Sequence, residues 1–226
     1  MLIATSLGAV AFVASLATAP IAAALPPVVV TVDVAADVPP MVVSIVLNEA
    51  TEIWRPAGLS VIWRRAARPD ASAITDPTSP CPALPIGLRV VIGDERGSAP
   101  PERTPLGWIV FGPDDVPAHE IYVSHRNAVD FLAGARGVVP PVAQMPLAER
   151  NLKLGRAMGR ALAHEMGHYL LASKVHARRG LMQATHTASA FFDNDRSSFA
   201  IDNALRQELA ARLRHEPLAA VVQPGT

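Results

Sequence analysis

The sequence has little cysteine and no excess of charge of either sign. Cys81 is the one cysteine among 226 residues, so no disulfide can form within the chain. Basic and acidic residues each number 20, giving a formal net charge of zero, and no basic block stands out. These absences argue against nucleic acid as a partner. A chain without disulfides must rely on its core for stability, and on a metal if it has one.

Hydrophobic residues and prolines are plentiful instead. Half of the residues are hydrophobic and 21 are prolines. This length is enough for one domain with a sizeable core, and the prolines favour fixed loops over a helical bundle. We therefore expect residues 25–226 to form one domain.

The first 24 residues form a segment of their own. They carry no charged side chain, and small residues, Ala22 to Ala24, precede Leu25. This resembles a secretory signal peptide, so we predict that residues 1–24 are removed and that the protein is exported, to the periplasm or the extracellular space. About 20 apolar residues also suffice to span a bilayer. An uncleaved anchor is therefore the alternative, and only then would a membrane be a partner.

Apolar periodicity predicts a β-α-β unit at the start of the domain. Strands are expected at Val28–Val34 and Leu59–Arg64, on either side of an amphipathic helix at Met41–Arg55. Such a unit implies a parallel strand pair with a right-handed crossover. Further elements are expected in this order: strands at Gly87–Ile92, Leu106–Phe111 and Glu120–Val123, a short helix at Asn127–Ala133, a long helix from Pro146, and a last helix capped by Ser197 or Ser198.

The long helix carries the motif that points to chemistry. His164-Glu165-Met166-Gly167-His168 places two histidines four residues apart, on one helix face and about one turn from each other. Two imidazoles so placed can hold one zinc ion, with the intervening Glu165 beside the open coordination position. Further toward the start of this helix, Lys153, Arg156 and Arg160 are expected along one polar stripe.

This region resembles the metzincin clan of zinc peptidases. The clan has the same two histidines, a third histidine downstream and a methionine turn, here matched by Gly180-Leu181-Met182. The resemblance implies an α+β fold of α/β character. Its parts would be a mixed, mostly parallel twisted sheet with a crossover helix, a long helix bearing the zinc site, and a C-terminal helix. Met182 would pack under the histidine ligands, and Gly107-Trp108-Ile109 would lie on an edge strand bordering the cleft.

The third ligand is where the sequence departs from the clan. The clan's glycine and third histidine fall on Leu171 and Lys174 here, and His176 comes two residues late. Eight residues past His168 is about 12 Å along a helix. The chain must therefore break near Ala172-Ser173 for His176 to act as third ligand. The alternatives are His186, or a carboxylate such as Asp193 or Glu208, as in the thermolysin-like clan.

Other residues have lesser expected roles. The tyrosine that some metzincins carry after the methionine is absent, since Ala184 stands there, which leaves Tyr122 and Tyr169 as candidate donors. Cys81 is expected to be an ordinary loop thiol and not a switch that caps zinc. The remaining histidines, His119, His125 and His215, are expected to face solvent.

The motif and the resemblance together predict a function. We expect a secreted endopeptidase that binds one zinc ion through His164, His168 and His176, with Glu165 as general base. Its partner would be a peptide or protein substrate. Two alternatives stay open: a non-catalytic secreted domain that binds zinc for folding or interaction, and a zinc amidase acting on cell-wall peptide.

Overall fold

The structure is a computed structural model that describes residues 25, 27–66, 87–94 and 105–215. The predicted signal peptide, the loop with Cys81 and residues 216–226 lie outside the described residues. The strands and helices follow in this order: β1 (Val28–Val34), α1 (Pro40–Trp54), β2 (Val61–Arg65), β3 (Leu88–Gly93), β4 (Gly107–Phe111), β5 (Pro117–Ser124), α2 (His125–Gly134), α3 (Leu147–Leu171), α4 (Ala188–Phe192) and α5 (Asn203–His215).

The strands form one mixed, mostly parallel sheet in the order β2-β1-β3-β5-β4. β1 pairs in parallel with β2 and β3, and β3 pairs in parallel with β5. β4 lies at the edge and runs antiparallel to β5. The predicted fold class is confirmed, including the parallel pair joined through α1 and the position of Gly107-Trp108-Ile109 on an edge strand.

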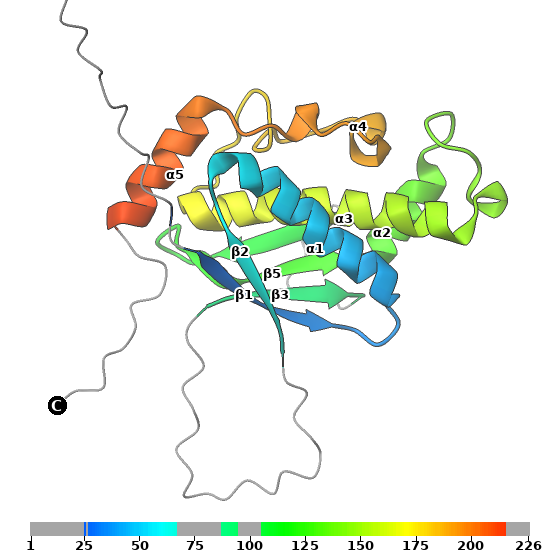
Figure 1. Cartoon of the computed structure of the whole chain (residues 1–226), viewed down its shortest axis with the longest axis horizontal. Coiled ribbons are helices and arrows are strands. Elements are labelled where there is room, and N and C mark those ends of the chain that lie inside the picture. The colour runs from blue at the N-terminus through cyan, green and yellow to red at the C-terminus, as the bar shows by residue number, and fades with distance from the viewer. Residues whose placement is uncertain (1–24, 26, 67–86, 95–104, 216–226) are drawn as a thin grey trace, which may run out of the picture.

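Two helices, α1 and α3, lie together over the same side of the sheet (Figure 1). Their backbones approach closely because α3 has glycines at the crossing. A Cβ at Gly159 would lie 2.6 Å from the Cβ of Glu49 and 2.8 Å from the Val46 carbonyl oxygen, both on α1. Farther along, the Trp54 indole donates to the carbonyl of Ala163, 3.2 Å away. This hydrogen bond from α1 therefore helps to position Ala163, the residue directly before His164.

The predicted elements match the structure within a few residues, with two exceptions near the C-terminus. The short helix α4 was not predicted. The cap of the last helix was predicted wrongly, because Ser197 lies in a separate 3-10 turn, Ser197–Phe199. The carboxylate of Asp202 accepts from the Leu205 amide at 2.8 Å instead, at the start of α5. Over the described part of the chain, no helix combines the length and apolarity needed to cross a membrane.

Candidate metal centre

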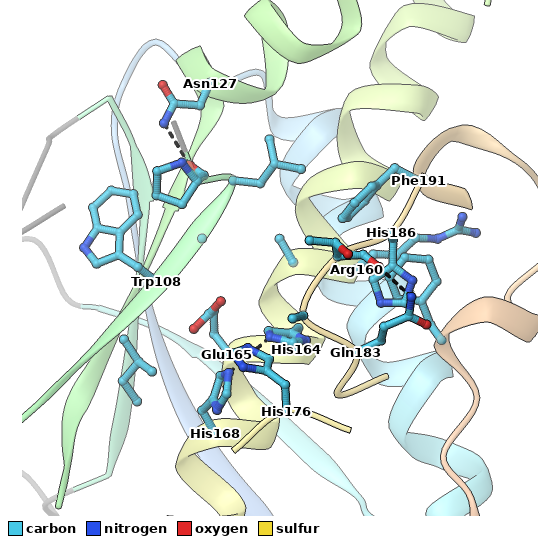
Figure 2. A pocket seen from close by; sticks show the side chains of 18 of the residues that line it. Trp108, Asn127, Arg160, His164, Glu165, His168, His176, Gln183, His186 and Phe191 are labelled. Carbon is cyan, nitrogen blue, oxygen red and sulfur yellow. Dashed lines mark hydrogen bonds between the residues drawn. The ribbon is translucent and has the colours of Figure 1, made fainter. Parts of the chain in front are cut away.

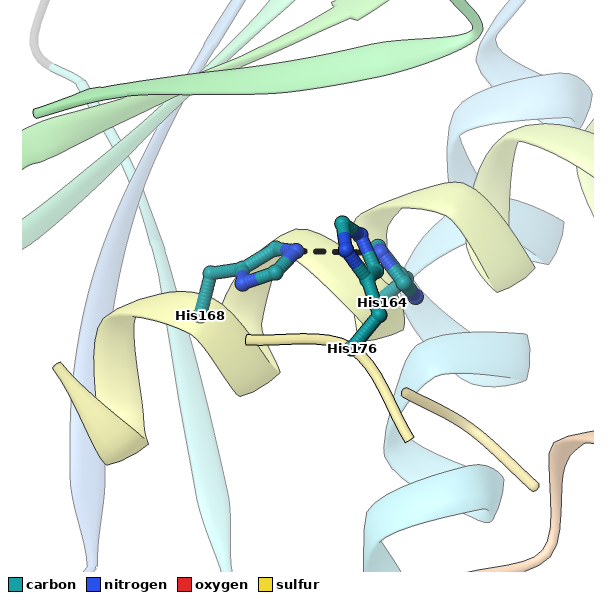
Figure 3. Close-up of side chains that lie close together, drawn as sticks. All are labelled: His164, His168 and His176. Atoms are coloured by element: carbon teal, nitrogen blue, oxygen red, sulfur yellow. Dashed lines mark hydrogen bonds between the residues drawn. The ribbon is translucent and has the colours of Figure 1, made fainter. Parts of the chain in front are cut away.

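Three histidines come together at the C-terminal part of α3 (Figure 3). α3 presents His164 and His168 one turn apart, and His176 reaches them from the segment that follows the helix. One ligand nitrogen from each lies within 4.8 Å of the others, a grouping able to hold a metal ion. Among the described residues, no fourth histidine, cysteine, aspartate or glutamate joins this group.

Hydrogen bonds settle which nitrogens of the two helical histidines are free. His164 Nδ1 donates to the carbonyl oxygen of Leu181 at 2.7 Å, and His168 Nδ1 donates to that of Ser173 at 2.6 Å. Their Nε2 atoms face each other at 3.1 Å. In neutral rings both Nε2 atoms then carry only lone pairs, which repel unless a cation lies between them. Two nitrogens on one tetrahedral zinc would lie about 3.3 Å apart.

Electrostatics favours the neutral, ligating form of these rings. Burial lowers the pKa of His164 to about 4, although its bond to the Leu181 carbonyl raises it, and the nearby histidines lower it further. Burial also lowers the pKa of His168. Both imidazoles are therefore available to a metal without first losing a proton at neutral pH.

The turn to His176 is made without glycine. α3 ends at Leu171, and Ala172 adopts the left-handed conformation with φ 43°. The Ser173 amide then donates to the carbonyl of His168 at 3.2 Å, which reverses the chain direction. The break predicted at Ala172-Ser173 is confirmed.

The methionine turn lies against the helix that bears the histidines. Met182 is almost fully buried, and a Cβ on Gly167 would lie only 2.2 Å from its sulfur. Gly167 therefore leaves the space that Met182 fills, directly before His168. The carbonyl of Met182 also accepts from the amide of Ala177 at 2.7 Å, which ties this turn to the residue after His176.

Glu165 faces the edge strand. A Cβ at Gly107 of β4 would come within 3.3 Å of the Glu165 Cγ, so the glycine gives this side chain its room. Burial raises the pKa of Glu165 to about 7, while a backbone hydrogen bond from Ile109 lowers it. A carboxyl group with this pKa exchanges protons near neutrality.

These groups line a cleft of about 670 Å³ (Figure 2). One wall is β4, and the opposite wall is the segment that carries His176, Gln183 and His186. Away from the three histidines, the cleft continues to an aromatic region. There Phe131 of α2 meets Phe191 of α4 edge to face at 5.5 Å, and Phe199 lies 5.4 Å from Phe191.

Arg160 belongs to this region, and its predicted place on a polar stripe was wrong. Its side chain is 0% exposed. It donates to Glu49 at 2.9 Å, to the carbonyl oxygen of Asp193 at 2.9 Å, and to that of Ala190. Glu49 is buried too and also accepts from Arg196 at 2.7 Å. The four-residue spacing from Arg160 to His164 was the signal that could have placed this arginine on the inner face.

The alternative third ligands do not join the three histidines. His186 lines the cleft but stacks on Phe199, with ring centroids 4.2 Å apart. Asp193 and Glu208 are exposed. The candidate donors are also placed elsewhere: Tyr122 donates to Glu120, and the Tyr169 hydroxyl bonds to His119 at 3.0 Å. Neither tyrosine lines the cleft.

One histidine outside the centre differs from its expected place. His125 is half-buried, and its ring lies near the carboxylates of Asp37 and Asp94, with ligand atoms within 4.8 Å of one another. Asp94 accepts from the Arg126 amide at 2.8 Å, in the first turn of α2. The positive end of that helix accounts for a carboxylate there.

Comparison with known proteins adds little to the sequence and the structure. No family model matches the sequence, and no curated protein matches it. Among solved structures, archaemetzincin from Methanopyrus kandleri is similar at 14% identity, over 85% of this chain and 97% of that one, with a TM-score of 0.41. A likeness this distant supports no conclusion about the fold or the activity of this chain.

Proposed function

We propose that this protein is a zinc-dependent peptidase in which His164, His168 and His176 hold one zinc ion. The observation that carries the proposal is the convergence of the three imidazoles beside Glu165 in one cleft. Two of them have Nδ1 bonded to a carbonyl, the arrangement that fixes metal-ligating histidines. The donor set fits zinc, which prefers imidazole nitrogen and accepts three protein ligands.

The chemistry then divides between the ion and the chain. Zinc, when bound, supplies a Lewis acid that polarises a carbonyl oxygen and acidifies water. Glu165, which lies in the same cleft as the three histidines, takes the proton of the attacking water and passes it to the leaving amine. β4 is the edge strand of the sheet formed by the described residues, and its outer side offers backbone groups that an extended peptide pairs with.

Export stays part of the proposal. Residues 1–24, apolar and without charge, support a signal peptide, and the substrate is then a peptide or protein outside the cytoplasm. N-terminal sequencing of the secreted protein tests this, with a mature start at or near Leu25 expected.

The two rival functions differ in measurable ways. A non-catalytic zinc domain would close its site with a fourth protein ligand, yet the group contains three within the described residues. A cell-wall amidase would share the centre and differ in substrate. Cell-wall peptides should therefore be assayed beside ordinary peptides.

The direct test is Glu165→Gln. We expect the variant to bind zinc as the wild type does and to lose at least about 100-fold in turnover on a broad peptide library, because the proton acceptor is gone. A chelator should abolish wild-type turnover, and added zinc should restore it. Full activity in Glu165→Gln would remove Glu165 from its role.

A further inference from the structure

The two walls of the cleft are joined at one end. Lys174, two residues before His176, forms an ion pair with Asp115 in the turn between β4 and β5. Its ammonium also lies 5.2 Å from the ring centroid of Phe111, the last residue of β4. The Phe111 ring in turn meets His168 edge to face at 6.3 Å. Beyond His168, therefore, the edge strand and the segment carrying the third histidine touch.

The cleft is consequently asymmetric about the three histidines. Away from Phe111 it extends to α2 and α4, where Asn127, Phe131 and Phe191 line it. Toward Phe111 the lining includes Lys174, which pairs with Asp115. The pairing of β4 with β5 also becomes irregular between Ile109 and Phe111. A peptide beside β4 thus has a regular strand edge only along Gly107 to Ile109.

The space beside β4 toward Phe111 can be expressed as a number of substrate residues. Glu165 contacts β4 at Gly107 and Ile109, which places the reacting bond beside this stretch. An extended peptide advances about 3.3 Å per residue, so from Ile109 to Phe111 there is space for roughly two substrate residues.

We propose that the Lys174–Asp115 pair limits the substrate on this side of the reacting bond, so that the protein cuts near one end of a peptide and not deep within it. This rests on the proposed peptidase function. Cleavage near a peptide end differs from the endopeptidase activity expected from the sequence. That expectation came from the zinc motif, which contains no information about the ends of the cleft. Lys174 and Asp115 act as specificity determinants, and neither takes part in the chemical step.

The size of the effect follows from the exposure of the pair. The side chains of Lys174 and Asp115 are 52% and 74% exposed, so the barrier they form is modest. An exposed ion pair contributes up to about 1 kcal/mol, which corresponds to roughly a fivefold bias. Concentrated salt weakens such a pair and should weaken the bias with it.

The test compares cleavage positions across a peptide mixture of varied length, mapped by mass spectrometry. The proteins are wild type, Lys174→Met, Asp115→Asn and the control Lys153→Met, which removes a lysine from a different pair on α3, with Glu149. Asn tolerates the positive φ of Asp115, so that variant should fold. Only cuts that Glu165→Gln abolishes are counted.

We expect wild-type and Lys153→Met cuts to cluster within about two residues of one peptide end. Internal cuts should rise roughly fivefold relative to terminal ones in Lys174→Met and Asp115→Asn, and in wild type at high salt. Cuts spread evenly along the peptides in wild type, or the same distribution in all four proteins, would overturn the inference while leaving the peptidase intact. Absence of any Glu165-dependent cut would overturn both.

Discussion

His164 donates its Nδ1 proton to the carbonyl oxygen of Leu181, 2.7 Å away and directly before Met182. This bond joins a residue on α3 to the turn that Met182 makes beneath the helix. It fixes the ring orientation and the tautomer, so that Nε2 faces His168. The methionine turn and the candidate metal centre are thus one structural unit.

The identity of the third ligand gives the first prediction. His176→Ala should lower zinc affinity by more than about 100-fold, because changes merely to groups that support a ligand already cost 10- to 100-fold. His186→Ala, which removes a ring stacked on Phe199, should leave zinc affinity near the wild-type value. Competition titration against a chromogenic chelator measures both. Equal losses in the two variants would contradict the assignment of His176.

The buried carboxyl of Glu165 gives a prediction about stability and pH. Its pKa in the folded state is about 7, raised from 4.5 by burial. Between these values the folded state binds more protons, so the contribution of Glu165 to stability falls as pH rises through this window. In zinc-free protein, Glu165→Gln should be more stable than wild type above pH 7, by at most about 3 kcal/mol, and nearly equal to it at about pH 4.5.

Thermal unfolding in the presence of chelator measures this difference across pH. His164, whose lowered pKa destabilises the fold as pH falls from 6.5 toward 4, is common to both proteins and cancels in the comparison. Glu149→Gln, on the same helix, is the control and should show no comparable change. A pH-independent gap between Glu165→Gln and wild type would refute the burial of this carboxyl.

The buried ion pair between α1 and α3 gives a third prediction. Glu49→Ala leaves Arg160 fully buried without its carboxylate partner and should cost about 3–5 kcal/mol. Glu52→Ala breaks a pair with Arg55, whose side chain is 72% exposed, and should cost under about 1 kcal/mol. Urea unfolding distinguishes the two. Similar small costs would mean that Arg160 finds other partners or water.

The turn after α3 gives a fourth prediction. Ala172 has φ 43°, a conformation that costs a non-glycine residue roughly 1–2 kcal/mol. Ala172→Gly should stabilise the protein by about 0.5–1 kcal/mol, since the greater freedom of glycine in the unfolded chain offsets part of the gain. Ala211→Gly, on an exposed face of α5, should destabilise by about 1 kcal/mol. Destabilisation by both changes would show that Ala172 is not strained.

Local sequence patterns predicted much of this fold. The predictions that were wrong concern residues whose contacts lie far away in the sequence or whose helix starts later than expected. The three-to-four spacing of apolar residues places α1, and a short run rich in β-branched residues places the buried strand β1. Arg160 was misplaced because an arginine is normally exposed, and its partners Glu49 and Arg196 are distant in sequence. Asp202 was missed as a cap because the helix was expected to start at Ser197 or Ser198. Those serines begin a separate 3-10 turn, and α5 starts after Asp202.

The candidate metal centre also combines residues that local spacing predicts with contacts that only the folded structure reveals. The spacing of His164 and His168 is local and predicts their convergence, as it predicts Glu165 between them. The approach of His176 depends on the left-handed turn at Ala172, which alanine adopts only when the surrounding structure imposes it. The Lys174–Asp115 pair joins residues far apart in the chain, so no sequence pattern could reveal it.

The coordination shell is the most direct test of the central claim. Zinc K-edge X-ray absorption on protein loaded with one equivalent of zinc should show three imidazole nitrogens and one further oxygen at about 2.0–2.1 Å. Removal of His176 should reduce the imidazole count by one. A shell filled by four protein ligands, or one unchanged when His176 is replaced, would contradict an open three-histidine zinc site.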